Sequence, residues 1–334
     1  MLLIILINGV KGDSNMKNDI DIKLYGGIFG FVVGDALGVP VEFISRNERK
    51  SDPVNSMRSY GSYKMPAGTW SDDSSLTLCL MDCINHGYST EALAENFIKY
   101  YKYGFMTPYN KNFDIGITTE EAIERMIRGI NPVECGSFSE EKSGNGSLMR
   151  ILPLAYYTKD MSPLERIHFV EEVSSLTHAQ KICKIACIFY NQVAIELLND
   201  CGKEEAYKNA INFVNITCAN EYSQDMKTLG RILNGEISDL KEDEIKSSGY
   251  VVDTLEAVMW CFMTTNCYKD SVLKAVNLGE DTDTIAAITG GLSGIYYGYN
   301  TIPKEWLKTI AKKDTISRMI KEFQRAVDIH KSVV

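Results

Sequence analysis

The sequence predicts an all-α protein, and three features of its 334 residues support that fold class. Apolar residues recur every three or four positions through most of the chain, which is the spacing of amphipathic helices. Segments in which apolar and polar residues alternate, as in half-buried strands, are scarce. Only eight prolines interrupt the chain. Because no polar break is long or simple enough to be a linker, we expect one domain over residues 22–332.

Residues 1–21 are expected to form a poorly ordered extension before this domain. Their apolar run, MLLIILINGV, has no basic segment before it and no A-x-A cleavage site after it. The run is also too short to span a bilayer, and we expect no membrane association. Met16 is a second candidate for the first residue of the native chain.

Two predicted helices carry small residues at every fourth position. The first has Gly26, Gly30, Gly34 and Gly38, and the second has Ala286, Gly290, Gly294 and Gly298. On a helix this spacing forms a stripe along one face. Each interior glycine costs a helix about 1 kcal/mol relative to alanine. We therefore expect the two stripes to pack against each other, or against a shared neighbour, at very close range.

Further segments show helical periodicity in chain order. The segment 68–84 starts with Ser71 or Asp72 as N-cap and then places Leu76 and Leu80 on one face. The other predicted helices cover residues 90–104, with Leu93, Phe97 and Tyr100 or Tyr101 on one face, and residues 120–130, 173–200 and 316–330. Polar breaks near 106–116, 135–147, 220–226 and 240–249 predict loops.

Charge and cysteine content narrow the range of partners. The chain has 35 Lys and Arg against 44 Asp and Glu, a net charge of −9. Bulk nucleic-acid binding is not expected, because a polyanion needs a basic surface. Nine cysteines occur without a CxxC pair, so a zinc site is not expected. We expect the cysteines to be free, buried thiols in a reducing cytoplasm. No oligomerisation pattern is visible, and we expect a monomer.

Two acid-rich helix starts are the main candidate functional feature: GTWSDDSSL at 68–76 and GEDTDT at 279–284. Each alone suits a helix cap, with Asp283 or Thr284 as the cap of the second. Together they hold more acid than caps need, and no Lys or Arg lies within 279–291. Converging carboxylates stay ionised only with cations between them. The oxygen donors that suit one or two Mg²⁺, Mn²⁺ or Ca²⁺ ions are Asp72, Asp73, Asp281, Asp283 and Thr284.

A glycine turn and one histidine are weaker candidates. Gly144 and Gly146 flank Asn145 and are followed by Ser147, ahead of a helix-like run. The N–H groups of such a turn can hold phosphate, although the same pattern also suits a simple turn. His178, in SLTHA, is either a ligand-binding residue or a structural histidine.

These segments, in this order, resemble the ADP-ribosylglycohydrolase family. The matching text runs from about Tyr25 to Gly298: GGIFGFVVGDALGVPVEF, GTWSDDSSL, GNGSLMRILPLA, SLTHA and GEDTDTIAAITGGLSGIYYG. The resemblance implies a compact, orthogonal multi-helix domain, all-α, with two Mg²⁺ or Mn²⁺ ions in a cleft. It also implies hydrolysis of an N- or O-glycosidic bond between ADP-ribose and a protein or small-molecule acceptor, which reverses ADP-ribosylation.

The resemblance assigns roles residue by residue. The implied metal ligands are Ser71, Asp72, Asp73, Asp281, Asp283 and Thr284. The implied catalytic residues are Glu42, Asp73 and Asp283, with Glu42 as the proton-handling group. The implied ADP-ribose-binding residues are Gly144, Asn145, Gly146, Ser147, Met149, Arg150 and His178. Two positions depart from the family pattern, since Ser71 stands where Thr is common and Glu280 where Gly is common.

Two alternatives to the glycohydrolase remain open. A metal-dependent phosphohydrolase would use the same carboxylates but attack phosphorus. An ADP-ribose-binding immunity or structural protein would bind without turnover. The acceptor is expected to contact loops outside the shared motifs, such as 104–116 and 241–250.

Overall fold

The computed structural model describes residues 19–331, with side chains described from Ile22 onward. Within this range the chain forms helices, short 3₁₀ turns and loops, and it contains no strand, only two isolated bridges. The predicted all-α class is therefore confirmed. Of the predicted extension, residues 1–18 lie outside the described range, and residues 19–21 belong to the first helix rather than to the extension.

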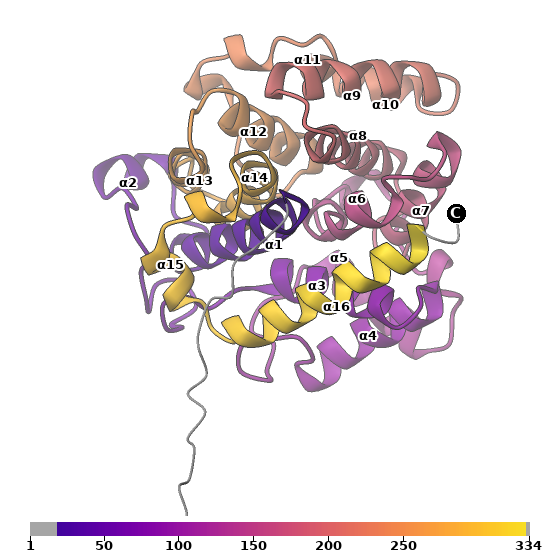
Figure 1. Ribbon diagram of the computed structural model, residues 1–334, viewed down its shortest axis with the longest axis horizontal. Helices are drawn as coiled ribbons and strands as arrows, with labels where there is room; N and C mark the ends of the chain where they lie inside the picture. Colours follow the sequence, from indigo (N-terminus) through magenta and orange to yellow (C-terminus); the bar gives the residue numbers. More distant parts are fainter. Residues whose placement is uncertain (1–18, 332–334) are drawn as a thin grey trace, which may run out of the picture.

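The helices of the described residues follow one another in this order: α1 (Asp19–Gly38), α2 (Arg46–Ser51), α3 (Asp72–Asn85), α4 (Thr90–Tyr103), α5 (Ile117–Ile127), α6 (Pro153–Thr158), α7 (Pro163–Ser175), α8 (Lys181–Leu198), α9 (Lys203–Thr217), α10 (Ser223–Thr228), α11 (Gly230–Leu233), α12 (Val251–Met263), α13 (Tyr268–Val276), α14 (Thr282–Tyr297), α15 (Lys304–Thr309) and α16 (Lys313–Lys331). They run in several directions, with α9 along one edge of the molecule and α4 along the opposite edge (Figure 1).

Helix α1 lies at the centre of this arrangement, beside α14 (Figure 1). From Leu24 to Gly38 every residue of α1 is buried, which explains why the helix is apolar on all sides. By length and composition alone, Ile22–Val41 could cross a membrane, but in this fold every residue from Leu24 to Val41 is buried inside the protein. Its apolar character is that of a core helix.

The two small-residue stripes pack directly against each other, as predicted. Helices α1 and α14 run antiparallel, so Gly30 faces Gly290 and Gly34 faces Ala286. A Cβ atom on Gly290 would overlap the carbonyl oxygen of Gly30. Gly298 ends α14 with φ 81°, and a Cβ there would meet the Ile22 side chain of α1 rather than its backbone. The close approach of two backbones is what requires the glycines.

Two sequence predictions about helix boundaries are wrong. The segment 173–200 is not one helix, because α7 ends at Ser175 and α8 starts at Lys181. The intervening backbone pairs instead with a distant loop: Ser137 N donates to Thr177 O at 3.1 Å, and Ala179 N donates to Ser137 O at 3.0 Å. The predicted loop 220–226 also contains the start of the short helix α10.

Cysteine usage follows the prediction. All nine cysteines lie in the described range and are free thiols, and seven of them are buried. They pack as small apolar side chains in the core.

Candidate active site

The candidate site forms where α1 ends and α14 and α3 begin. Since α1 and α14 are antiparallel, the last residue of α1 lies beside the first turn of α14, and Thr282 Oγ1 donates to Gly38 O at 2.9 Å. A 3₁₀ turn, Val39–Val41, then leads from α1 to Glu42. The glycine contact between α1 and α14 therefore brings Gly38 and Thr282 together, although they are 244 positions apart in sequence.

The start of α3 is fixed by a buried aspartate from α1. Ser71 is the N-cap, as one of the two predicted alternatives. Asp35 accepts hydrogen bonds from Ser71 N at 2.9 Å, Ser74 N at 3.0 Å and Ser74 Oγ at 2.5 Å. Burial raises the pKa of Asp35 to about 6, although these hydrogen bonds oppose the increase. Asp35 thus orients the helix start that carries Asp72 and Asp73.

The start of α14 differs from its sequence interpretation. Asp281 occupies the N-cap position, so Asp283 and Thr284 lie inside the first turn and neither is the cap. The Asp281 side chain makes no capping bond and instead accepts from Asn145 Nδ2 at 2.7 Å. The Asp281 carboxylate is therefore directed to the site, whereas Asp283 Oδ1 also accepts from Thr284 N of its own helix at 2.9 Å.

Carboxylates from several elements converge on Asp283. Ligand oxygens of Asp35, Asp73 and Asp283 lie within 4.8 Å of one another, and so do those of Glu42, Asp114 and Asp283. Hydroxyl groups link the first set, because Ser71 Oγ and Thr284 Oγ1 donate to Asp73 Oδ2 at 2.9 and 3.2 Å. Asp283 belongs to both groups and joins them into one acidic site.

Burial and mutual repulsion raise the pKa of these acids. For Glu42 the pKa rises to about 8, first through burial and then through the charges of Asp114 and Asp281. For Asp73 and Asp283 the pKa also rises, again mainly through burial and then through neighbouring carboxylates. Without a cation, these groups hold protons at a pH where exposed carboxyls have lost them.

The donor set fits divalent metal ions. Two carboxylate oxygens, Glu42 Oε2 and Asp73 Oδ1, are buried and have no hydrogen-bond partner among the described residues. Buried polar atoms are nearly always paired, so two orphaned carboxylate oxygens in one site indicate a missing positive partner. Carboxylates with serine and threonine hydroxyls are oxygen ligands of the kind that Mg²⁺ and Mn²⁺ take.

A cleft of about 350 Å³ opens over these acids. Its walls come from the loop after Glu42, the segment before and into α5, the glycine turn at 144–146 and the start of α14. No described residue lining it is a lysine or an arginine. The lining carboxylates are Glu42, Asp72, Asp114, Asp281 and Asp283. The cleft is thus strongly acidic, and a cation or a cationic group is needed to bring an anion into it.

The glycine turn forms one end of the cleft. Its backbone is held by a second chain segment, since Asn145 N donates to Gly249 O at 3.0 Å and Val251 N donates to Ser143 O at 3.0 Å. Gly144, Asn145, Gly146 and Met149 all line the cleft. A Cβ on Gly146 would come within 2.6 Å of the His178 ring, so glycine is needed where the turn crosses the imidazole.

Ser147 and Arg150 lie behind this turn rather than in the cleft. Both are fully buried, and neither lines the cavity. The Arg150 guanidinium donates to Gly146 O and, at 2.9 Å, to Val173 O, and it stacks over Phe97. The implied role of Ser147 and Arg150 in binding ADP-ribose stays a prediction, and in this structure their side chains lie behind the turn.

His178 reaches the cleft from the break between α7 and α8. Burial, and next the Arg150 charge, lower its pKa to about 3, so the imidazole is neutral at physiological pH. Its Nδ1 lies 2.8 Å from Thr177 Oγ1. The expectation of a histidine within a helix is wrong, because pairing with residues 135–137 breaks the helix there.

Sequence analysis missed Asp35 and Asp114 as members of the site. Asp35 follows a glycine in the motif GDALG, and that adjacency was the only local signal. Asp114 stands alone in the loop NFDIG, without any pattern that marks it. Tyr63 lies beside Asp114 and Glu42, since its hydroxyl lowers the pKa of both carboxyls.

Comparison with known proteins identifies the family to which the chain is similar. The profile of the ADP-ribosylglycohydrolase family matches residues 16–331. The chain is 32% identical to an ADP-ribosylarginine hydrolase, Tri1, of Serratia proteamaculans, over 90% of this chain and 78% of the relative. It is 26% identical to the ADP-ribosyl-[dinitrogen reductase] glycohydrolase of Rhodospirillum rubrum, over 92% and 94% of the two chains. A solved structure described as an ADP-ribosylglycohydrolase-related protein complex superposes with a TM-score of 0.77 at 26% identity, covering 92% of this chain and 99% of that one.

Proposed function

The chain belongs to the ADP-ribosylglycohydrolase family and is a glycohydrolase, and on that premise we propose that it uses two divalent cations to release ADP-ribose from a guanidinium acceptor. The observation that carries this proposal is the convergence on Asp283 of two carboxylate groups with orphaned buried oxygens. Relatives named ADP-ribosylarginine hydrolases support the choice of acceptor.

The proposed metal ligands are Ser71, Asp72, Asp73, Asp281, Asp283 and Thr284, with Mg²⁺ or Mn²⁺ as the ions. Bound cations would orient the ribose hydroxyls and a water molecule and stabilise the negative charge that develops on them. Asp283 is the natural shared ligand, since its carboxylate belongs to both acidic groups. Asp35 acts through the start of α3, which it fixes by two hydrogen bonds from backbone N–H groups and one from the Ser74 hydroxyl.

The diphosphate of ADP-ribose is assigned to the end of the cleft at Gly144–Gly146. Backbone N–H groups of a glycine turn suit phosphate oxygens. The neutral His178 ring and Met149 border the same end. Arg150 contributes by holding the Gly146 carbonyl from behind, so that the turn keeps its shape when an anion binds.

The part of the cleft lined by Glu42, Phe43 and Asp114 suits a planar cation. Glu42 and Asp114 supply negative charge, and no described lining residue is a Lys or Arg that would compete for them. Phe43 stands at the rim with 74% of its surface exposed and with φ 64°, a conformation that a bulky residue seldom adopts. The centroid of the Phe43 ring lies 6.3 Å from that of Tyr63, and the centroid of the Tyr63 ring lies 5.1 Å from that of Phe113. A guanidinium pairs with carboxylates and stacks on aromatic faces, whereas a serine hydroxyl gains neither interaction.

Glu42 is the proposed proton-handling residue. Its Oε2 has no partner among the described residues, and Glu42 lines the cleft together with Asp283. Water attacks the anomeric carbon, the bond from that carbon to the guanidine nitrogen breaks, and the proton lost by the water reaches the leaving nitrogen through Glu42. A carboxyl beside the leaving group is the usual requirement of glycoside hydrolysis.

The decisive experiment is product analysis on matched substrates. We expect free ADP-ribose from ADP-ribosylated arginine, slower release from ADP-ribosylserine, and no release in EDTA. Glu42→Gln should lose activity, while Asp82→Asn, a half-exposed acid on α3 outside the cleft, should retain it. AMP as product would replace the proposal by phosphohydrolysis, and tight ADP-ribose binding without turnover would replace it by a binding or immunity role.

The acceptor assignment has its own control. Phe43→Ala should raise KM for ADP-ribosylarginine while leaving ADP-ribosylserine turnover unchanged. Tyr60→Ala is the matched control, because Tyr60 is also an exposed aromatic residue with positive φ, 59°, but does not line the cleft. Equal effects of the two substitutions on both substrates would contradict a guanidinium subsite. A monomeric, cytoplasmic enzyme remains part of the proposal.

A further inference from the structure

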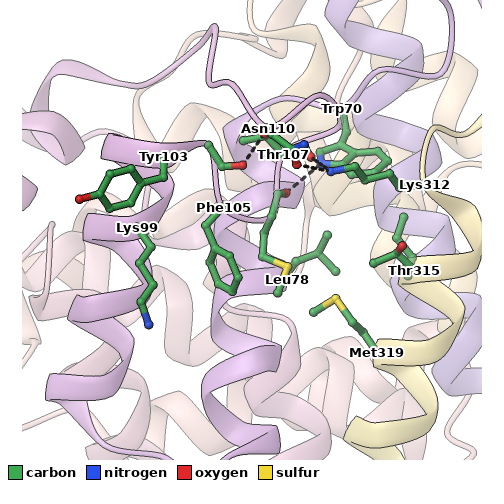
Figure 2. Close-up of a pocket in the computed structure, with 13 residues that line it drawn as sticks. Trp70, Leu78, Lys99, Tyr103, Phe105, Thr107, Asn110, Lys312, Thr315 and Met319 are labelled. Carbon is green, nitrogen blue, oxygen red and sulfur yellow. Dashed lines mark hydrogen bonds between the residues drawn. The ribbon is translucent and has the colours of Figure 1, made fainter.

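A second cavity, of about 560 Å³, lies between α3, α4, the loop after α4 and the start of α16 (Figure 2). It shares no lining residue with the acidic cleft. Its apolar lining consists of Trp70, Leu78, Phe105, Met106, Ile316 and Met319. A cavity of this size, mostly apolar and with few polar groups, is typical of small-molecule sites, which span roughly 300–1,000 Å³.

The charge of this cavity is the opposite of that of the cleft. Among the described residues, two lysines and no acid line it, in a chain whose net charge is −9. Lys99 is neutralised by Glu95 at 2.8 Å. Lys312 has no such partner among the described residues: its ammonium donates to Thr107 O and Asn110 Oδ1, each at 2.8 Å, and both acceptors are uncharged. Figure 2 shows Lys312 at the edge of the cavity, with dashed lines from its ammonium to Thr107 and Asn110.

Two further features favour an anion at Lys312. Burial lowers the pKa of Lys312, and no neighbouring carboxylate opposes that effect. Lys312 directly precedes the 19-residue helix α16, whose N-terminal end carries partial positive charge. An ammonium has three N–H donors, and only two of those of Lys312 are used.

We infer that this cavity, named here the Trp70 pocket, binds a small free amphipathic carboxylate. The apolar body would pack between Trp70, Phe105 and Met319, and the carboxylate would pair with Lys312. Apolar lining supplies the hydrophobic part of the affinity, and the unneutralised lysine selects an anion over an alcohol or a cation.

The walls of the Trp70 pocket continue into the acidic site. Trp70 directly precedes Ser71, and Trp70 Nε1 donates to Met106 O at 3.4 Å. The loop that holds Met106 runs on to Asp114, and Lys312 ties that loop to α16 at Thr107. A carboxylate on Lys312 therefore changes the restraint on the segment 104–116, which carries Asp114.

The test uses decanoate as probe, below its micelle-forming concentration, with decan-1-ol and decyltrimethylammonium as neutral and cationic controls. Bromine-labelled decanoate should quench tryptophan fluorescence, because Trp70 lines the pocket while Trp260 and Trp306 do not. Trp70→Phe should abolish the quenching. Lys312→Gln should weaken decanoate binding at least about tenfold, as expected for one charge-assisted hydrogen bond, and leave decan-1-ol binding unchanged. Lys313→Gln, one position along, is the matched control outside the lining and should behave as wild type.

Several outcomes would overturn the inference: no quenching by the labelled acid, equal affinity for the three probes, or wild-type affinity in Lys312→Gln. Thr315→Phe fills the cavity and decides the question if Lys312→Gln fails to fold, since all three probes should then lose binding. Hydrogen exchange gives a second readout, in which decanoate slows exchange over 104–116 in wild type and not in Thr315→Phe. None of these measurements depends on catalysis, so a failed glycohydrolase assay leaves them valid.

Discussion

The middle and the end of the α1–α14 pair have opposite physical character. In the middle, Gly30 and Gly290 bring two backbones into contact, and no charged side chain lies between them. At the end, Asp283 lies within 4.8 Å of four other carboxylates, with Asp35 and Asp73 on one side and Glu42 and Asp114 on the other. One region is packed to the limit of sterics, and the other is electrostatically unfavourable without a cation.

The difference shows how the fold tolerates its site. Converging buried carboxylates repel one another and favour separation of the elements that carry them. The glycine contact opposes that separation, because it fixes α1 against α14 directly behind the acids. The stability of the glycine contact therefore offsets the repulsion among the carboxylates at the end of the helix pair. Scaffolds commonly stabilise active sites in this way.

Breaking the middle should have the largest effect. Gly290→Leu is expected to lower the free energy of unfolding by about 4 kcal/mol or more, since the facing atoms are backbone and cannot yield. Urea denaturation measures the change. Gly230→Leu is the control, because nothing lies within 4 Å of a Cβ there, and it should cost less than about 1 kcal/mol. A wild-type midpoint for Gly290→Leu would disprove the close contact.

Removing the Asp283 charge at the acidic end of the helix pair should change activity and stability in opposite directions. Asp283→Asn is expected to lower kcat/KM roughly a thousandfold, about 4 kcal/mol, because it removes the carboxylate shared by both groups. The same substitution should raise the stability of the metal-free protein, since it relieves repulsion. Steady-state kinetics and denaturation in EDTA give the two values. A variant that is less stable and equally active would contradict the comparison.

The acidic end should also make stability depend on pH. The pKa of Asp35 and of Asp114 is raised to about 6 and that of Glu42 to about 8, so the folded state holds protons that the unfolded chain has lost above about pH 4. Stability contributed by these groups is complete below pH 4 and is lost as pH rises through 6 to 8.

We expect a loss of about 6 kcal/mol for the metal-free protein between pH 5 and pH 8, more than half of it from Glu42. Denaturation midpoints at these two pH values, in EDTA and in Mg²⁺, measure it. Saturating Mg²⁺ should flatten the dependence, because a bound cation favours the ionised carboxylates. A midpoint that rises with pH in EDTA would show that the acids are not raised in pKa.

The smallest effect is expected at Glu280, beside the acidic end. Its φ is 61°, and its backbone is paired with the loop of Phe43 through Phe43 N to Glu280 O at 2.7 Å. Glu280→Gly should stabilise the protein by about 0.5–1 kcal/mol by removing the left-handed strain, with activity unchanged, since this carboxylate is exposed. Glu280→Ala removes the charge but keeps the strain, so an equal gain in both variants would assign the effect to charge instead.

Much of the fold could be predicted from local sequence. Helical periodicity located α4, α5 and α16, and Leu93, Phe97 and Tyr100 are buried on one face as expected, while Tyr101 is only half-buried. The small-residue stripes in α1 and α14 indicated their contact, because a helix face made of small residues allows a second backbone to approach closely. Helical periodicity and small-residue stripes repeat along the chain, so each can be identified from one segment without knowing which segment packs against it.

By itself, then, the sequence determined the helical class, the glycine contact and the two acid-rich helix starts. Tertiary structure decided which oxygens share one site. It brought in Asp114 from an unmarked loop, turned Asp281 to Asn145, and placed Arg150 behind the glycine turn. It also ended α7 before His178 by pairing that segment with residues 135–137. Periodicity and capping are local interactions and are written in neighbouring residues, whereas burial and convergence depend on distant segments that meet only when the chain has folded.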